Sequence, residues 1–346
     1  MYRCLELAEK GSGFVAPNPM VGAILVHDGK IISEGYHQQY GQAHAEANCL
    51  NSVDQENKHR IKDSILYVSL EPCAHFGKTS PCTDLIIAEQ IPEVIIGCRD
   101  PFEKVDGKGI ENLKNAGINV VYGILEKECQ QINKRFFTYH TRHRPYIILK
   151  WAETGDRKIA GTGTDRLHIS NEQTNRLVHK WRSEEAAILI GTNTALLDDP
   201  ELTTRNWEGP SPVRSVVDMD LKLPLSLKIF NDKQKTIVFN TIKHEENGNL
   251  SFYQVTEDVS LVHQIVNALY QLNIQSVIVE GGAKLLQSFI EEEMWDEARV
   301  IKNDKLIIHH GLAAPELPVR ESAQDLTILN DSINTYFKDA NTFSVK

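Results

Sequence analysis

Two stretches of the 346-residue chain decide how its first part folds: His44-Ala45-Glu46 and Leu70-Glu71-Pro72-Cys73-Ala74-His75-Phe76-Gly77-Lys78-Thr79-Ser80-Pro81-Cys82. A catalytic zinc ion takes three protein ligands, usually imidazole or thiolate, and keeps a fourth position open for water. His44, Cys73 and Cys82 supply such a set. Glu46 follows the histidine closely, so its carboxylate can move protons without binding the metal. The two stretches therefore predict a zinc site that activates water, with Glu46 as its catalytic acid and base.

The spacing of the ligands narrows the class of site. Zinc deaminases combine H-x-E with a later P-C-x-x-C. Here Pro72-Cys73 is present, but the second thiol follows after eight residues instead of two. The alternative is a closed zinc site or a set of buried thiols, since free cysteine is often buried without doing chemistry. A closed site would need a fourth ligand and would leave Glu46 without a role.

With its inner residues, the long spacing resembles the deaminase half of the bifunctional riboflavin biosynthesis protein RibD family. The family run reads roughly L-E-P-C-S-H-x-G-[RK]-T-P-P-C, and this chain departs from it at Ala74 and Ser80. The resemblance also covers residues 17–23, Asp100-Pro101 and Gly107-Lys108-Gly109. It implies a cytidine-deaminase-like α/β/α domain that deaminates a phosphorylated diaminopyrimidine. The implied substrate contacts are Asn18, His37, His75, Lys78 and Asp100.

Composition limits the partners and the compartment. The chain has 37 Lys and Arg against 47 Asp and Glu, a net charge of −10, so no basic surface for a nucleic-acid backbone is expected. All six cysteines lie before residue 130, which favours a reducing compartment and a metal over a disulfide framework. We find no charged and apolar leader and no apolar run of membrane-spanning length. We expect a cytoplasmic homo-oligomer that binds neither nucleic acid nor membrane.

The expected elements of the first half alternate between helix and strand. Helices are expected over residues 2–10, 45–50, 83–89, 109–116 and 126–137. Strands are expected over residues 23–26, 31–32, 65–70, 94–97 and 119–122. Asp28-Gly29 between the first two strands is typical of a hairpin turn, and Glu46 would lie in the first turn of its helix. This order predicts helix layers around a largely parallel sheet. His140 matches no motif, and we expect it at the surface.

Arg142-His143-Arg144-Pro145 ends the first half, and we predict two domains, residues 1–143 and 146–346. In the second, Ser170-Asn171-Glu172 has the capping oxygen and early acid of a helix that would run to about Arg182. The expected strands are residues 146–152, 186–190, 215–218, 236–239 and 276–279. The last leads into Glu280-Gly281-Gly282 and a helix, where backbone amides can approach an anion. The usual G-x-G-x-x-G dinucleotide fingerprint is absent from the sequence.

The second domain also resembles the reductase half of the same family, which implies its fold, its cofactor and its contact residues. The resemblance rests on residues 150–160, 168–170, 190–205, 218–224 and 280–282. It implies a fold similar to dihydrofolate reductase, with NADPH as hydride donor. The implied cofactor contacts are Ala152, Thr154, His168, Thr194, Asp198 and Gly282. The implied contacts with the substrate or its phosphate are Lys150, Arg182, Leu202, Arg205 and Glu280. Lys150 and Asp198 are candidate catalytic proton donors by position.

This half departs from the family pattern around the expected cofactor site. Arg157 replaces a glycine, Arg166 a serine, His168 a tryptophan and Ser170 a threonine. A reductase domain that only supports the deaminase is therefore one alternative. A deaminase of a free nucleotide or an RNA base, and a zinc-stabilised binding module without activity, are two others. The leading hypothesis is a bifunctional enzyme that first deaminates the pyrimidine and then reduces its ribosyl side chain to ribityl.

Overall fold

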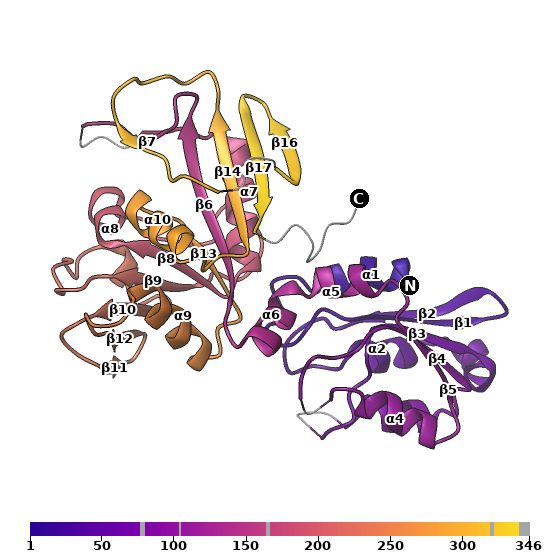
Figure 1. Ribbon diagram of the computed structural model, residues 1–346. Coiled ribbons are helices and arrows are strands. Elements are labelled where there is room, and N and C mark those ends of the chain that lie inside the picture. The colour runs from indigo at the N-terminus through magenta and orange to yellow at the C-terminus, as the bar shows by residue number, and fades with distance from the viewer. Residues whose placement is uncertain (77–79, 104, 164–166, 319–321, 339–346) are drawn as a thin grey trace. The chain divides into compact units, whose positions relative to one another are not determined.

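The computed structural model describes residues 1–76, 80–103, 105–163, 167–318 and 322–338. By its internal contacts the chain divides into two compact units, the first comprising Met1–His143 and the second beginning at Arg144. Each unit has a sheet of its own (Figure 1). None of the helices that the structure describes has both the length and the apolar character needed to span a lipid bilayer.

The first unit is built on a five-stranded sheet of order β2-β1-β3-β4-β5. The strands are β1 (Gly22–His27), β2 (Lys30–Tyr36), β3 (Ile65–Leu70), β4 (Glu93–Cys98) and β5 (Asn119–Tyr122). Strand β1 pairs antiparallel with β2 and β3, while β3, β4 and β5 are parallel. The predicted hairpin is confirmed: Asp28 and Gly29 have φ angles of 47° and 73°, which a tight hairpin turn requires.

Helices cover both faces of this sheet. They are α1 (Tyr2–Glu9), α2 (Ala45–Asn51), the 3₁₀ helix η1 (Gln55–Asp63), α3 (Cys82–Ala88), α4 (Lys108–Asn115), α5 (Glu126–Ile132) and α6 (Lys134–Arg142). Figure 1 shows α1 and α5 on one side of the sheet and α2 and α4 on the other. The predicted α/β/α layers are confirmed.

The prediction of a single helix over residues 126–137 is wrong, because the helix is interrupted at Asn133. Helix α5 ends at Ile132 and α6 begins at Lys134. The buried Asn133 side chain accepts a hydrogen bond from the backbone N–H of Met20 and donates one to its carbonyl oxygen, both at 2.8 Å. These bonds join segments 113 residues apart. A long-range contact therefore fixes Asn133 outside helical geometry, with φ −104° and ψ 19°.

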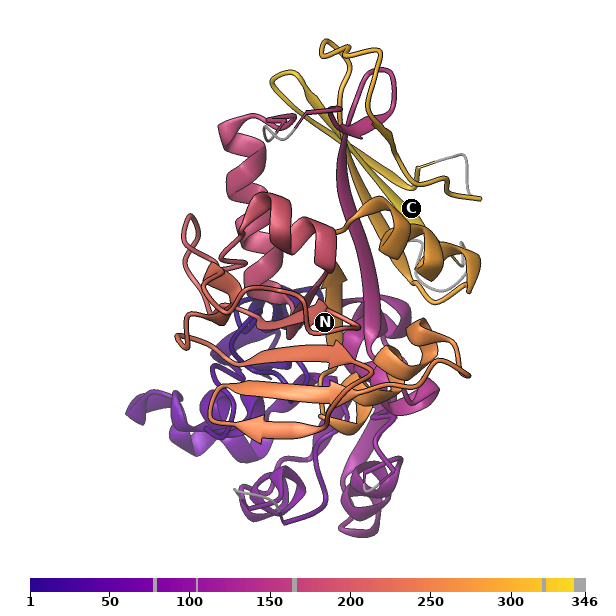
Figure 2. The same ribbon diagram turned by 90° about the vertical axis from the view of Figure 1, so that its left-hand side faces the viewer.

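The second unit has a ten-stranded sheet of order β11-β12-β10-β9-β8-β13-β6-β14-β17-β16. Its strands are β6 (Tyr146–Thr154), β8 (Ala187–Gly191), β9 (Val213–Val217), β10 (Thr236–Asn240), β11 (Glu245–Asn247), β12 (Leu250–Gln254), β13 (Ser276–Val279), β14 (Glu297–Asn303), β16 (Gln324–Ile328) and β17 (Asp331–Phe337). From β12 to β14 all neighbours are parallel, whereas β11, β17 and β16 pair antiparallel. Strands β10, β12 and β11 form one edge, drawn in orange tones in Figure 2. A separate pair joins β7 (Lys158–Ala160) and β15 (Leu312–Ala313).

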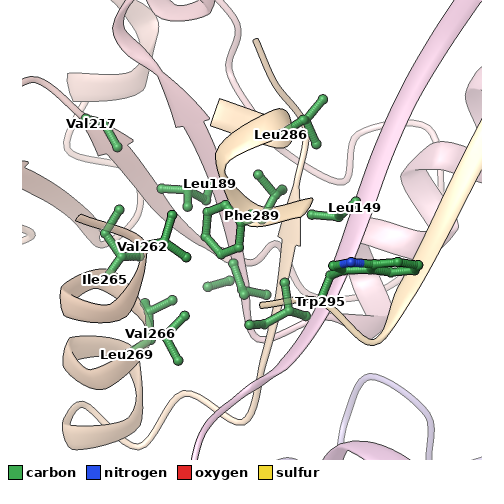
Figure 3. Close-up of a cluster of buried hydrophobic side chains, with 14 of the residues drawn as sticks. Leu149, Leu189, Val217, Val262, Ile265, Val266, Leu269, Leu286, Phe289 and Trp295 are labelled. Atoms are coloured by element: carbon green, nitrogen blue, oxygen red, sulfur yellow. The ribbon is translucent and has the colours of Figure 1, made fainter. Parts of the chain in front are cut away.

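Alternate residues of the central strands build two separate cores. The helices are α7 (Glu172–Glu184), α8 (Thr192–Asp198), α9 (Leu261–Gln271) and α10 (Ala283–Glu291), with the 3₁₀ helix η2 (Lys228–Phe230). On one face, Leu149 and Leu189 pack under α9 and α10 (Figure 3). On the other face, Ile148 and Ile188 join residues of α7 and α8. Because side chains alternate between the two faces along each strand, consecutive residues are buried in different cores.

The start of α7 follows the sequence prediction, since Asn171 Oδ1 accepts a hydrogen bond from the backbone N–H of Thr174 at 2.9 Å. Helix α8, helix α9 and the strands after residue 296 were not predicted. The strands β14 and β17 extend the sheet beyond β6. The fold therefore belongs to the predicted class, but the second unit contains more helices and strands than were predicted.

Candidate active sites

Three predicted metal ligands meet at one end of the first sheet. His44 directly precedes α2, Cys73 follows β3, and Cys82 begins α3. The Nδ1 atom of His44 lies 3.5 Å from the sulfur of Cys73 and 3.4 Å from that of Cys82. In a tetrahedral zinc site with bonds of about 2.0 Å to nitrogen and about 2.3 Å to sulfur, these atoms lie about 3.5 Å apart. The three side chains therefore fit a zinc ion, with all ligand atoms within 4.8 Å of one another.

The backbone around the cysteines keeps the cluster together. The N–H group of Cys82 donates to the sulfur of Cys73 at 3.3 Å. The N–H group of Thr83 donates to the carbonyl oxygen of Cys73 at 3.2 Å. A sulfur that accepts a backbone hydrogen bond is favoured as a thiolate, which is the form that binds a metal.

Glu46 lies in the first turn of α2, close to the cluster. Its side chain is 3% exposed. Burial, together with the negative charge of Cys73, raises the pKa of Glu46 to about 7. A carboxyl group with a pKa near neutral can both accept and return a proton, which suits general acid and base catalysis.

Asn18 and His37 form a pair beside the metal cluster. The Nδ1 atom of His37 lies 3.0 Å from the carbonyl oxygen of Ala43, so this nitrogen must carry the proton. Its Nε2 atom is then the acceptor for the Asn18 side-chain amide at 3.1 Å. The His37 ring packs edge-on against the ring of His44, with centroids 5.3 Å apart. Burial lowers the pKa of His37, so the ring is neutral near pH 7.

Asp100 and His75 lie on two loops that follow strands. Asp100 is buried, its Oδ1 atom accepts a hydrogen bond from the N–H group of Phe102 at 2.8 Å, and burial raises its pKa to about 7. The ring of Phe102 contacts that of His75 edge-on at 5.9 Å between centroids. Within the described residues, the Nδ1 atom of His75 is buried and has no hydrogen-bond partner. Lys78, the fifth predicted contact, lies outside the described residues.

The expectation of a surface His140 is wrong. Its ring lies between those of Phe102 and Phe136, at 5.0 Å and 4.4 Å between centroids, and burial lowers its pKa to about 4. An isolated histidine carries no sequence signal for such a stack. The periodic apolar positions of α6, with Phe136 buried, are the signal that could have placed it.

The second site is built around a buried ion cluster at the end of β13. Glu280 accepts two hydrogen bonds from Arg182, from Nε at 2.8 Å and from Nη2 at 2.7 Å. The Nζ atom of Lys150, on β6, lies 3.6 Å from the same carboxylate. Burial alone would raise the pKa of Glu280, but the two cations outweigh it and lower the pKa to about 2. The cluster therefore holds three predicted substrate residues together as a charged unit.

Beside this cluster lie three glycines, which have no side chains to cover the backbone. Gly191 ends β8, and its N–H group donates to the carbonyl oxygen of Gly281 at 2.8 Å. A Cβ atom at Gly282 would lie 3.3 Å from the hydroxyl oxygen of Thr194, and Gly281 has a φ angle of +125°. Helix α10 starts after Gly282 without a side-chain cap. This backbone can approach a ligand closely, and the first N–H groups of α10 suit an anion.

The remaining predicted residues of the second unit lie on other elements. Thr154 is fully buried, and its hydroxyl donates to Asp156 and accepts from the N–H group of Lys158, so it is engaged in the turn after β6. Ala152 lies two residues earlier on β6. Asp198 ends α8, Leu202 is buried, and Arg205 and His168 are exposed.

His179 is a buried residue near this site that the sequence analysis missed. It lies one turn before Arg182 on α7 and is 4% exposed. Burial, with the charges of Arg182 and Arg205, lowers its pKa to about 4. His179 is part of no recognisable sequence motif, so its place near the site becomes evident only from the packing of α7.

These features define two classes of catalytic unit. The first is a zinc deaminase fold with a buried glutamate, and residues 1–98 match the cytidine and deoxycytidylate deaminase zinc-binding region. The second is a reductase fold, and residues 145–307 match the RibD C-terminal domain.

Whole-chain comparisons agree. The chain is 37% identical over 344 residues to the riboflavin biosynthesis protein RibD of Aquifex aeolicus, covering 98% of this chain and 95% of that protein. It is 31% identical to the protein of the same name from Escherichia coli, covering 94% and 92%. A crystal structure from Thermotoga maritima, a diaminohydroxyphosphoribosylaminopyrimidine deaminase/5-amino-6-(5-phosphoribosylamino)uracil reductase, matches with a TM-score of 0.87 at 35% identity, covering 97% and 96%. The chain belongs to the RibD family, whose members are deaminases and reductases of riboflavin biosynthesis.

Proposed function

We propose that the first unit hydrolyses the 2-amino group of 2,5-diamino-6-ribosylamino-4(3H)-pyrimidinone 5′-phosphate, and that the second then reduces the ribosyl side chain of the product to ribityl with NADPH. The observation that carries the first step is the His44, Cys73 and Cys82 cluster with the buried Glu46 beside it. The name of the Thermotoga maritima relative supports both the order and the substrate.

In the deaminase unit, His44, Cys73 and Cys82 would hold zinc. The ion supplies the Lewis acidity that makes water a nucleophile near neutral pH. The carboxylate of Glu46 takes a proton from the attacking water and returns one to the amine, which leaves as ammonia. The water oxygen becomes the new ring carbonyl, so the atoms of the hydrolysis balance.

The same unit offers groups that can orient the pyrimidine. Asn18, held by His37, presents an amide that can both donate and accept. Asp100, with its pKa raised to about 7, can donate as an acid or accept as a carboxylate. Lys78 and His75 stay predicted contacts with the substrate and its phosphate.

In the reductase unit, NADPH supplies the hydride. The bare backbone at Gly191, Gly281 and Gly282 and the uncapped start of α10 support a cofactor site there. The exposed Arg205 suits bidentate binding of the substrate phosphate. As the hydride reaches the carbonyl carbon of the opened ribose, its oxygen takes a proton, for which Lys150 and Asp198 are the proposed donors. Contacts of Ala152, Thr154, His168 and Leu202, like the cytoplasmic location and the homo-oligomer, stay predictions.

Mass spectrometry of the products tests the proposal. Zinc-loaded protein is incubated with the diaminopyrimidine ribosyl phosphate, with and without NADPH. We expect the reaction without NADPH to stop at the deaminated compound and the complete reaction to yield the ribityl compound. If both stop at deamination, the proposed reductase step is wrong. If neither reacts, the proposed substrate is wrong.

A further inference from the structure

Glu71 is a buried carboxylate next to the metal cluster that the proposed mechanism does not use. It lies two residues before Cys73, at the end of β3, and is 3% exposed. Its two oxygens accept four hydrogen bonds from backbone N–H groups. The donors are Asp100 at 3.2 Å, Gly107 at 3.0 Å, Gly109 at 2.9 Å and Ile110 at 3.2 Å. These bonds offset the cost of burying the carboxylate.

One oxygen of Glu71 caps α4 from a distant part of the chain. Oε1 accepts from Gly109 and Ile110, in the first turn of this helix. The helix follows Gly107, whose residue type offers no side chain for a cap. A carboxylate at this position satisfies N–H groups that have no partner within the helix and lies at the positive end of its dipole.

The other oxygen of Glu71 closes the loop between β4 and α4. Oε2 accepts from Asp100, the second residue after β4, and from Gly107, just before α4. Asp100 then folds its own carboxylate back onto the N–H group of Phe102. One side chain therefore fixes both ends of the segment that presents Asp100.

The glycines beside this contact fit the close approach. A Cβ atom at Gly109 would lie 2.1 Å from the carbonyl oxygen of Pro72 and 3.1 Å from Oε1 of Glu71. Gly107 has a φ angle of +87°, which side chains rarely allow. Gly107 and Gly109 are therefore the residues that let the backbone come close enough to bind the carboxylate of Glu71.

We propose that Glu71 is a positioning residue of the deaminase, which fixes Asp100 relative to the metal-binding Cys73. This inference rests on the proposed role of Asp100 as a substrate contact. A glutamine at position 71 has one oxygen and one NH₂ group, while all four facing backbone groups are donors. The NH₂ group would therefore oppose two N–H groups and displace the loop that carries Asp100.

The test uses full-length, zinc-loaded E71Q. We expect one zinc per chain, an unchanged reductase rate on the deaminated compound, and a deaminase KM at least tenfold higher with kcat within threefold of the wild type. A general loss of structure would lower kcat and zinc content together, so this split is specific to positioning. An unchanged KM, or loss of zinc with the KM of the remaining active fraction unchanged, would overturn the proposal.

A second variant tests the same contact independently, in case E71Q does not fold. Gly109→Ala places a methyl group against Pro72 from the other side of the contact, and we expect the same rise in KM. Gly117→Ala is the control: it follows the same helix, and no other atom lies within 4 Å of the position that its Cβ atom would take. Because its φ angle of +85° strains an alanine there, an unchanged KM in this variant shows that backbone strain alone does not raise the KM. Equal KM values for the two glycine variants would contradict the proposal. A wild type that does not deaminate the compound would instead refute the proposed function.

Discussion

At the scale of single residues, Glu280 is the buried carboxylate at the centre of an ion cluster in the second unit. It is paired with Arg182 and Lys150, and all three side chains are largely shielded from water. Removing one partner of a buried pair leaves an uncompensated charge, which costs about 3–5 kcal/mol. Glu280 therefore stabilises the reductase fold as well as shaping its proposed site.

The stability that Glu280 provides should depend on pH. Its pKa is about 2 in the folded protein against a reference value of 4.5, so the contribution is complete above pH 4.5 and is lost as pH falls towards 2. We expect the unfolding free-energy difference between wild type and E280Q to shrink by about 1.4 kcal/mol per pH unit in that window.

Tryptophan fluorescence in urea measures this difference, because all four tryptophans, Trp151, Trp181, Trp207 and Trp295, belong to the second unit. A difference that stays constant from pH 6 to pH 3 would show that Glu280 is not held ionised by its partners.

At the scale of elements, the break between α5 and α6 shows how a distant contact decides a boundary. Local pattern favours one helix, but the two bonds between Asn133 and Met20 end it. The predicted strands β3, β5 and β13 match the structure because each is a run rich in β-branched and other apolar residues. Strands β14 and β17 were not predicted, because polar and charged residues interrupt their apolar positions and leave no run typical of a strand.

Asn133→Ala should destabilise the first unit by about 1–3 kcal/mol, because it leaves the N–H and carbonyl groups of Met20 without their partner. The measurement is the urea concentration at which half of the bound zinc is released, which should fall. Asn119→Ala is the control, because its hydrogen bond to Glu93 is exposed. Equal midpoints for the two variants would mean that the Asn133 bonds contribute little.

In the candidate sites too, some features could be predicted from local sequence and others depend on contacts between residues far apart in the chain. Ligand chemistry and spacing are enough to predict the metal cluster, which the structure brings together. The engagement of Arg182 by Glu280 spans 98 residues and could not be read from either motif. Glu71 stands inside the deciding motif, yet its role depends on a loop up to 39 residues later.

At the scale of the whole molecule, each unit has its own sheet, core and proposed site. Among the residues that the structure describes, the only cluster of three metal-ligating side chains belongs to the first unit. The chain thus joins two catalytic units that can be tested separately within one protein.

Zinc removal should separate the two activities. We expect a chelator to abolish deamination and to leave the reduction of the deaminated compound within about twofold of its starting rate, since the reductase unit has its own cores. Both rates are measured on the same sample, and added zinc should restore the first. A parallel loss of both rates would show that the reductase fold depends on the metal site.

The most direct test of the account is the deaminase rate of zinc-loaded E46Q, measured with its zinc content and its reductase rate. Glutamine keeps the shape of the side chain but cannot accept and return a proton. We predict one zinc per chain, an unchanged reductase rate, and a deaminase kcat lower by about 10²–10⁴, the contribution of general acid and base catalysis. Deamination at the wild-type rate with zinc bound would contradict the role of Glu46 and, with it, the proposed mechanism of the first unit.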